Sequence, residues 1–200
     1  MARHAPRITL TLPMHHHSRD NRILSLDVHS KTLAYAVFED PAQLLDFSVS
    51  RSAHSGFQAT RVEKLVRKFQ PEVIVLRRIP VGSSRDTLAA RSAIRSIRSK
   101  ARSLSIPVVF IDKRNIDATF RDHCKPTKHR IAVLLAACFQ PLAWYVPRER
   151  KPWTPEDRRM QYFDAAAAGL TYFASEGNAE TVRQLLSEAE TRSQSLNRDT

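Results

Sequence analysis

The chain has 200 residues, of which 42% are hydrophobic and 26% charged, a composition that suits one globular domain and excludes a disordered chain. Its 32 Lys and Arg outnumber its 20 Asp and Glu, giving a formal net charge of +12. Such an excess favours a polyanionic partner, because cationic side chains that neutralise phosphates release condensed counterions. The alternative is a solvated basic surface.

The sequence has no feature of a membrane or secreted protein. No apolar stretch approaches the roughly 20 residues that cross a bilayer, and the run His15–His17 interrupts the region where a signal peptide would be apolar. Cys124 and Cys138 have no further cysteine at metal-ligand spacing, so we expect reduced core thiols in a cytoplasmic protein. Residues 1–20 predict a flexible basic arm, in which the histidines form a polar tail and not a metal site.

Three short apolar runs open the folded region, separated by polar or turn-prone residues. They cover 23–27, 33–38 and 44–49 and predict an antiparallel meander. Ser55 is a candidate N-cap for the helix that the apolar spacing predicts at 56–69.

The next segments alternate between strands and helices. Val73–Leu76 and Val108–Ile111 are continuous apolar runs, which are typical of strands buried on both faces of a sheet. Between them, Gly82–Ser84 begins a predicted helix that runs to about Leu104. Further helices are expected near 113–120, 127–139, 155–174 and 178–190.

This order of elements predicts an α/β fold with a mixed five-stranded sheet, in which three antiparallel strands precede a βαβα segment. We expect one domain at 21–175, followed by a C-terminal helix and frayed tail at 176–200. No internal repeat or second domain is visible in the sequence.

Two carboxylates stand at positions typical of a metal site. Asp27 ends the first strand, and Asp164 lies on the late helix beside the small residues Ala165–Gly169. A pair of Mg²⁺ ions about 3.5–4 Å apart needs several oxygen ligands. A further acid is therefore expected directly after Leu76, at the end of the fourth strand.

Over about 22–175 the chain resembles the RuvC family of Holliday junction resolvases, members of the RNase H-like superfamily. The resemblance rests on Ile23–Asp27 leading into Thr32–Val37, on Pro71–Leu76, and on Asp164 followed by a small-residue helix. It implies an RNase H-like fold, Mg²⁺-dependent cleavage of branched DNA and a homodimer. It also implies that Asp27 is the metal-bridging aspartate and Asp164 the last helical ligand.

The sequence departs from the family pattern at two of the four ligand positions. The family's glutamate at the end of the fourth strand falls on Arg77, with Arg78 beside it. The acid or histidine one turn before Asp164 falls on Gln161, and Val28-His29 replaces the usual Pro-Gly after the first aspartate. An arginine repels Mg²⁺ instead of coordinating it.

Two hypotheses for this site stay open. In the first, Arg77 or Arg78 pairs with Asp27 and Asp164, and the site holds no metal. In the second, Mg²⁺ is still bound by Asp27 and Asp164, and the catalytic set is completed by a neighbour: Asp157, predicted on the same helix face as Asp164, or Asp86 or His29.

Three groups of basic residues are candidates for contact with nucleic-acid phosphates. The first is a helical stripe without interleaved acids: Arg91, Arg95, Arg98 and Arg102. The second comprises Arg121, Lys125, Lys128, His129 and Arg130. The third lies in a loop after Trp144 and Tyr145 and comprises Arg148, Arg150, Lys151 and Trp153. Its aromatic side chains either stack on unpaired bases or pack the loop itself.

Three functions follow from these features. The leading hypothesis is a nucleic-acid-binding protein, for DNA or RNA, that derives from a metal-dependent endonuclease, has lost catalysis and acts as a subunit of a larger nucleoprotein assembly. The alternative is an active Mg²⁺-dependent endonuclease that resolves branched DNA. The third is a structural protein whose basic faces dock on a ribonucleoprotein.

Overall fold

The computed structural model describes residues 22–52, 54, 56–151 and 153–196. The predicted arm at 1–20, its histidine run and the predicted N-cap Ser55 lie outside these residues. In the part of the chain that is described, no helix is both long enough and apolar enough to cross a membrane.

Five strands form one mixed sheet, which confirms the predicted fold class. The first strand pairs antiparallel with the second and parallel with the fourth, and the order across the sheet is β3-β2-β1-β4-β5. The strands are β1 (Ile23–Val28), β2 (Thr32–Asp40), β3 (Gln43–Arg51), β4 (Val73–Arg77) and β5 (Val108–Ile111).

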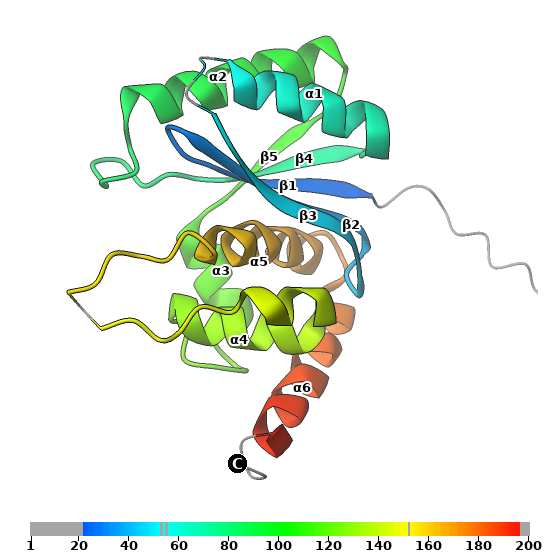
Figure 1. Cartoon of the computed structure of the whole chain (residues 1–200). Coiled ribbons are helices and arrows are strands. Elements are labelled where there is room, and N and C mark those ends of the chain that lie inside the picture. Colours follow the sequence, from blue (N-terminus) through cyan, green and yellow to red (C-terminus); the bar gives the residue numbers. More distant parts are fainter. Residues whose placement is uncertain (1–21, 53, 55, 152, 197–200) are drawn as a thin grey trace, which may run out of the picture.

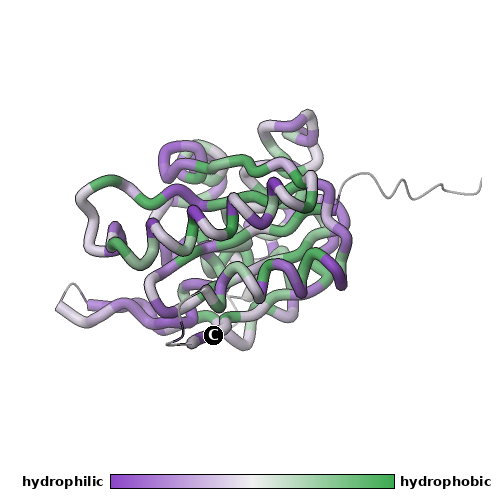
Figure 2. The backbone as a smooth tube through the Cα atoms, turned by 90° about the horizontal axis from the view of Figure 1, so that it is seen from above, coloured by the Kyte–Doolittle hydropathy of each residue, from purple (hydrophilic) through white to green (hydrophobic). Residues whose placement is uncertain are grey.

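Helices cover both faces of this sheet (Figure 1). Two amphipathic helices, α1 (Phe57–Phe69) and α2 (Leu88–Ser103), lie side by side on one face, and hydrophilic and hydrophobic residues alternate along them (Figure 2). The opposite face is covered by α5, and the remaining helices pack beneath and around it. These elements are α3 (Lys113–Phe120), α4 (Lys128–Cys138), the 3₁₀ helix η1 (Gln140–Tyr145), α5 (Met160–Ser175) and α6 (Ala179–Leu196).

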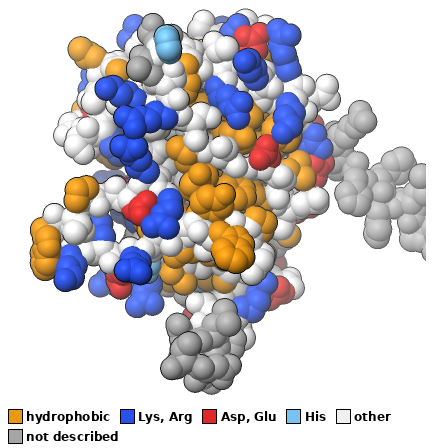
Figure 3. Space-filling view, in the orientation of Figure 1, with side chains coloured by type: hydrophobic (Ala, Val, Ile, Leu, Met, Phe, Trp, Pro, Cys, Tyr) orange, Lys and Arg blue, Asp and Glu red, His pale blue; other side chains and the backbone are white. Residues whose placement is uncertain are grey.

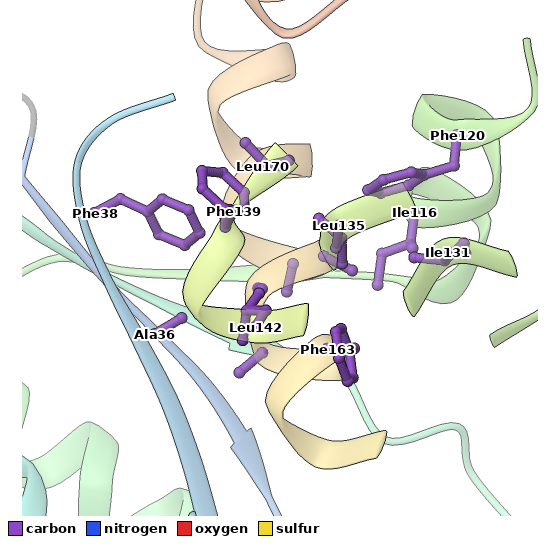
Figure 4. Close-up of a cluster of buried hydrophobic side chains, with 14 of the residues drawn as sticks. Ala36, Phe38, Ile116, Phe120, Ile131, Leu135, Phe139, Leu142, Phe163 and Leu170 are labelled. Atoms are coloured by element: carbon purple, nitrogen blue, oxygen red, sulfur yellow. The ribbon is translucent and has the colours of Figure 1, made fainter. Parts of the chain in front are cut away.

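Alternation along the strands creates a separate core on each face. Leu24 and Leu26 of β1 pack with the α1–α2 layer, whereas Ile23 packs with the α5 layer. Successive strand side chains point to opposite faces, so a continuous apolar run supplies both layers. Figure 4 shows part of the core on the α5 side of the sheet. In it, the rings of Phe38 and Phe139 meet edge to face with centroids 5.6 Å apart.

Small residues bring α5 close to the centre of the sheet. A Cβ added at Gly169 would lie 2.6 Å from Phe38 Cε2, which leaves no room for a larger residue there. The Ser25 hydroxyl of β1 donates a hydrogen bond of 2.7 Å to the carbonyl of Ala165. The close packing of this small-residue segment therefore fixes the position of α5 on the sheet, and with it the position of Asp164.

The predicted start of the second helix at Gly82–Ser84 is wrong, because α2 begins at Leu88. The Thr87 side chain caps the helix by accepting a hydrogen bond of 3.1 Å from Ala90 N. The Asp86 carboxylate accepts a hydrogen bond of 2.9 Å from Gly82 N, which closes the preceding segment as a loop. Arg85 therefore lies in a loop and not in a helix.

The last two helices also differ from their predicted bounds. α5 begins at Met160 instead of 155, because the Asp157 carboxylate accepts a hydrogen bond of 2.9 Å from Arg159 N in the turn before the helix. α6 extends to Leu196, beyond the predicted end near 190, and buries Val182 and Leu186 in the same core as α4 and α5. This helix is therefore part of the packed structure.

The two cysteines are free thiols, consistent with the prediction. Burial raises the pKa of Cys138 to about 12, so this thiol is unreactive near neutral pH.

Candidate functional site: a carboxylate pair held by cations

The two predicted carboxylates are brought together at one end of the sheet. Asp27 lies at the end of β1 and is 1% exposed, and Asp164 reaches the same place from α5 with 7% exposure. Charged groups this deeply buried need opposite charges or hydrogen bonds, because water no longer solvates them. Their partners therefore decide what the site can do.

The first partner is Arg77, at the end of β4. Leu26 and Leu76 are paired in the parallel register of β1 and β4, so Asp27 and Arg77 follow at the same level of the sheet. Arg77 Nη1 lies 2.8 Å from Asp164 Oδ2 and 3.6 Å from Asp27 Oδ1. These are contacts between charges without hydrogen-bond geometry, since Nη1 has no hydrogen-bond acceptor. The guanidinium occupies the position expected for a third carboxylate.

The second partner is Arg85, whose role the sequence did not predict. Its Nη2 donates to both oxygens of Asp27, at 2.5 Å to Oδ1 and 2.6 Å to Oδ2, and its Nη1 lies 3.5 Å from Asp164 Oδ2. The loop between β4 and α2 carries this arginine over the end of the sheet. The turn residues Gly82–Ser84 and the N-cap Thr87 were the sequence signals that could have placed Arg85 in a loop.

Two further groups complete the cluster. Lys128, the first residue of α4, places its Nζ 3.2 Å from Asp164 Oδ2 and also pairs with Glu156. His29 Nε2 lies 2.9 Å from Asp27 Oδ2 and faces Arg85 Nη2 at 2.6 Å. We call Asp27, Asp164, Arg77, Arg85 and Lys128 the ion-pair centre.

The two carboxyl groups of this centre titrate in opposite directions. Burial opposes ionisation of Asp27, but the His29 hydrogen bond and the charges of Arg85 and Arg77 outweigh it and lower the pKa. Burial and the charge of Asp27 raise the pKa of Asp164, and the charges of Arg77, Lys128 and Arg85 offset them only in part. Asp27 is therefore the member of the pair that ionises at the lower pH.

The residues of the ion-pair centre do not fit a divalent metal. Both oxygens of Asp27 accept hydrogen bonds from Arg85, and Asp164 Oδ2 contacts Arg77 and Lys128. Magnesium needs several free oxygen ligands, whereas cations close to these two carboxylates already balance their charge. Across the described residues, no group of three or more His, Cys, Asp or Glu side chains could hold a metal ion.

The acids predicted to complete a metal site are paired elsewhere. Asp157 precedes α5, so its predicted place on the same helix face as Asp164 is wrong; it is bound by Arg159 at 2.7 Å. The Asp86 carboxylate is held by Arg91 at 2.5 Å. Of the two arginines proposed to neutralise the carboxylates, Arg77 does so, whereas Arg78 pairs with Asp112 at 2.9 Å.

The predicted arginine stripe lies on the exposed face of α2, but its members have different surroundings. Arg91 is engaged by Asp86, and the Arg98 guanidinium lies 5.7 Å from the centre of the Phe110 ring. Arg95 and Arg102 are exposed. Figure 3 shows Lys and Arg side chains over much of the upper half of this view, where α1 and α2 lie.

The second and third basic groups meet at one cavity. A cavity of about 350 Å³ is bordered by the start of α4 and by the loop after η1, and Lys128, Arg148 and Arg150 are among its lining residues. Lys125, Arg130 and Lys151 are exposed. Trp144 and Trp153 are 87% and 77% exposed, so these tryptophans do not pack into the loop.

Comparison with solved structures identifies the architecture. Thermus thermophilus RuvC matches with a TM-score of 0.60 at 16% identity, over 78% of this chain and 96% of that chain. The structure of the same protein in complex with a Holliday junction substrate matches with a TM-score of 0.58, at the same identity and coverage. The yeast mitochondrial Holliday junction resolvase gives 0.52 at 12% identity, over 88% of this chain and 85% of that chain.

The sequence matches no protein-family model and no curated protein at a significant level. The structural match extends over 78% of this chain and nearly the whole of the Thermus thermophilus protein. The chain therefore has the RuvC-type, RNase H-like fold.

Proposed function

We propose that this protein binds branched DNA through a RuvC-type fold and does not hydrolyse the phosphodiester backbone. The observation that carries the proposal is the ion-pair centre, in which Arg77 and Arg85 contact both buried carboxylates and Lys128 contacts Asp164. These cations occupy the surroundings of Asp27 and Asp164 that a metal-dependent nuclease keeps open for Mg²⁺.

The charges of the centre support a loss of catalysis. A divalent ion would have to displace the Arg85 guanidinium from both oxygens of Asp27 and would still meet the positive charge of Arg77. Displacement would leave a partly buried arginine and a fully buried carboxylate without their mutual contact, which is costly where water is largely excluded. Metal-assisted activation of water at this place is therefore strongly disfavoured.

The binding part of the proposal rests on charge and on the solved neighbours. The chain carries a formal net charge of +12, and exposed Lys and Arg lie on α2, on α4 and in the loop after η1. One neighbour of the same fold was solved in complex with a Holliday junction substrate. A basic surface on this fold suits a branched polyanion whose shape and backbone are recognised, not its sequence.

The test is an incubation of the protein with labelled four-way-junction and duplex DNA in Mg²⁺ and in Mn²⁺, with binding and cleavage scored on the same samples. We expect salt-dependent binding of the junction, no cleavage, and the same outcome for Asp27→Asn. The active-endonuclease alternative predicts cleavage by the parent protein that Asp27→Asn abolishes. Absence of binding to either DNA would contradict the proposal as a whole.

A further inference from the structure

The loop between η1 and α5 extends beyond the body of the protein at the end of the sheet where β1 and β4 finish (Figure 1). At that same end lies the ion-pair centre. The two regions are contiguous, because Lys128 contacts Asp164 and also lines the cavity that Arg148 and Arg150 border. Nucleic acid lying over the ion-pair centre would therefore pass along this loop.

Trp153 is held outward by a turn within this loop. Thr154 N donates a hydrogen bond of 3.0 Å to the carbonyl of Lys151, and the Thr154 hydroxyl donates another of 2.8 Å to the same oxygen. Arg150 Nη1 donates to the Thr154 carbonyl at 3.0 Å. These bonds tie Thr154, the residue after Trp153, to Arg150 and Lys151, while the Trp153 ring stays 77% exposed.

The surroundings of the ring are cationic. Lys151 Nζ lies 5.7 Å from the centre of the Trp153 ring, and Arg148 and Arg150 belong to the same exposed segment. An indole ring beside several cations matches the chemistry of a single-stranded nucleotide, whose base offers a flat π-face and whose phosphate offers negative charge. A fully paired duplex offers the phosphates but keeps its bases stacked inside.

We propose that Trp153 stacks on an unpaired base, so that this loop makes the protein prefer nucleic acid with unpaired positions over a continuous duplex. This inference rests on the proposed function and adds the substrate feature that the loop recognises, an unpaired base. Arg148, Arg150 and Lys151 hold the flanking phosphates while the ring takes the base.

The chain has two tryptophans, which makes fluorescence a direct probe. Trp144 is the matched control: it is 87% exposed and lies on η1, next to Tyr145, whose ring packs on Phe47 and Tyr162. The variant Trp144→Phe leaves Trp153 as the sole indole, and Trp153→Phe leaves Trp144. Each is titrated with a duplex that has a short unpaired gap in one strand and with the same duplex fully paired.

We expect the gapped DNA to quench the fluorescence of Trp144→Phe strongly and that of Trp153→Phe only weakly. Trp153→Ala should lose affinity for gapped DNA by about 5- to 150-fold, the range for one lost base–aromatic stack, and keep its affinity for the paired duplex. Trp144→Ala should change neither. An unchanged preference in Trp153→Ala would overturn the stacking inference alone, whereas a parent protein that bound neither DNA would overturn the proposed function with it.

Discussion

Arg77 and Asp27 lie side by side at the ends of two neighbouring parallel strands, with Arg77 Nη1 3.6 Å from Asp27 Oδ1. The sequence pattern predicts the end of β4 as the place for a third acidic ligand of a metal site. Here the same position places a fixed positive charge against both carboxylates, and Arg85 adds a second from the following loop. Two fixed positive charges therefore lie where a metal site would need acidic oxygen ligands.

Removal of Arg77 should destabilise the fold. Arg77→Met leaves two buried carboxylates with fewer cations, and breaking a buried pair in this way costs about 3–5 kcal/mol of unfolding free energy. Urea unfolding measures the loss. Arg78→Met is the control, because Arg78 and Asp112 are about half exposed and their pair contributes less than about 1 kcal/mol. Equal losses of unfolding free energy in the two variants would mean that the ion-pair centre stabilises the fold no more than an exposed ion pair does.

Stability should depend on pH through Asp27. Its pKa is lowered in the folded protein, so its ionised form contributes stability that is fully present above its ordinary pKa of 3.8 and is lost as the pH falls through the folded pKa. Asp27→Asn should therefore be less stable than the parent at about pH 6, and the difference should shrink at about pH 3. Urea unfolding at both pH values tests this, with Asp122→Asn at an exposed position as the control. If the stability difference between the parent and Asp27→Asn stayed constant with pH, the pKa of Asp27 would not be lowered in the folded protein.

A metal site should appear when the arginines are replaced. Arg77→Glu combined with Arg85→Ala supplies a third carboxylate at the end of β4 and frees the oxygens of Asp27. Titration calorimetry with Mn²⁺ should detect binding to this variant and not to the parent protein. Arg78→Glu combined with Arg85→Ala is the matched control, since position 78 points its side chain to Asp112. Equal binding by the control would show that the position of the third carboxylate does not matter.

Gly169 should tolerate no side chain while Phe38 is present. Gly169→Ala places a methyl group 2.6 Å from the Phe38 ring, and such overpacking costs about 1–3 kcal/mol. The parent protein, Gly169→Ala, Phe38→Leu and the double variant form a double-mutant cycle, whose stabilities are measured by thermal unfolding. We expect the double variant to be more stable than the sum of the two single effects predicts, because leucine makes room for the methyl group. If the effects of the two single variants on stability were strictly additive, contact with Phe38 would not determine how closely α5 packs on the sheet.

Binding should be sensitive to salt through the stripe on α2. Each phosphate contact contributes about −0.9 to the slope of log K against log salt on duplex DNA, so Arg95→Ala combined with Arg98→Ala should reduce the slope by about 2. Fluorescence anisotropy with junction DNA over a salt series provides the measurement. Arg183→Ala combined with Arg192→Ala removes the same charge from α6 and should leave the slope unchanged. Equal changes in both variants would indicate a non-specific effect of net charge.

The sheet and the carboxylate pair could be predicted from the sequence because both depend on local patterns. Continuous apolar runs marked β4 and β5, and Asp27 and Asp164 follow from strand and helix positions. The role of Arg85 could not be predicted in this way. It depends on how a loop closes over the sheet, through a bond between Gly82 and Asp86 that sequence spacing does not reveal.

The same limit applies to the surface predictions. Helical spacing correctly placed the arginines of α2 on one exposed face. It did not show that Arg91 is already engaged by Asp86, because that pair spans the boundary between loop and helix. The exposure of Trp153 was likewise undetermined, since a loop rich in proline and arginine can fold back on its own aromatic residues or present them to solvent.

The most direct test of the ion-pair centre is a crystal of the parent protein soaked in Mn²⁺, with the anomalous signal of the metal used to locate it. We predict no anomalous peak between Asp27 and Asp164 and an Arg85 guanidinium that still contacts both oxygens of Asp27. A peak that bridges the two carboxylates, with Arg85 displaced, would contradict the account and make the protein a metal-dependent nuclease candidate.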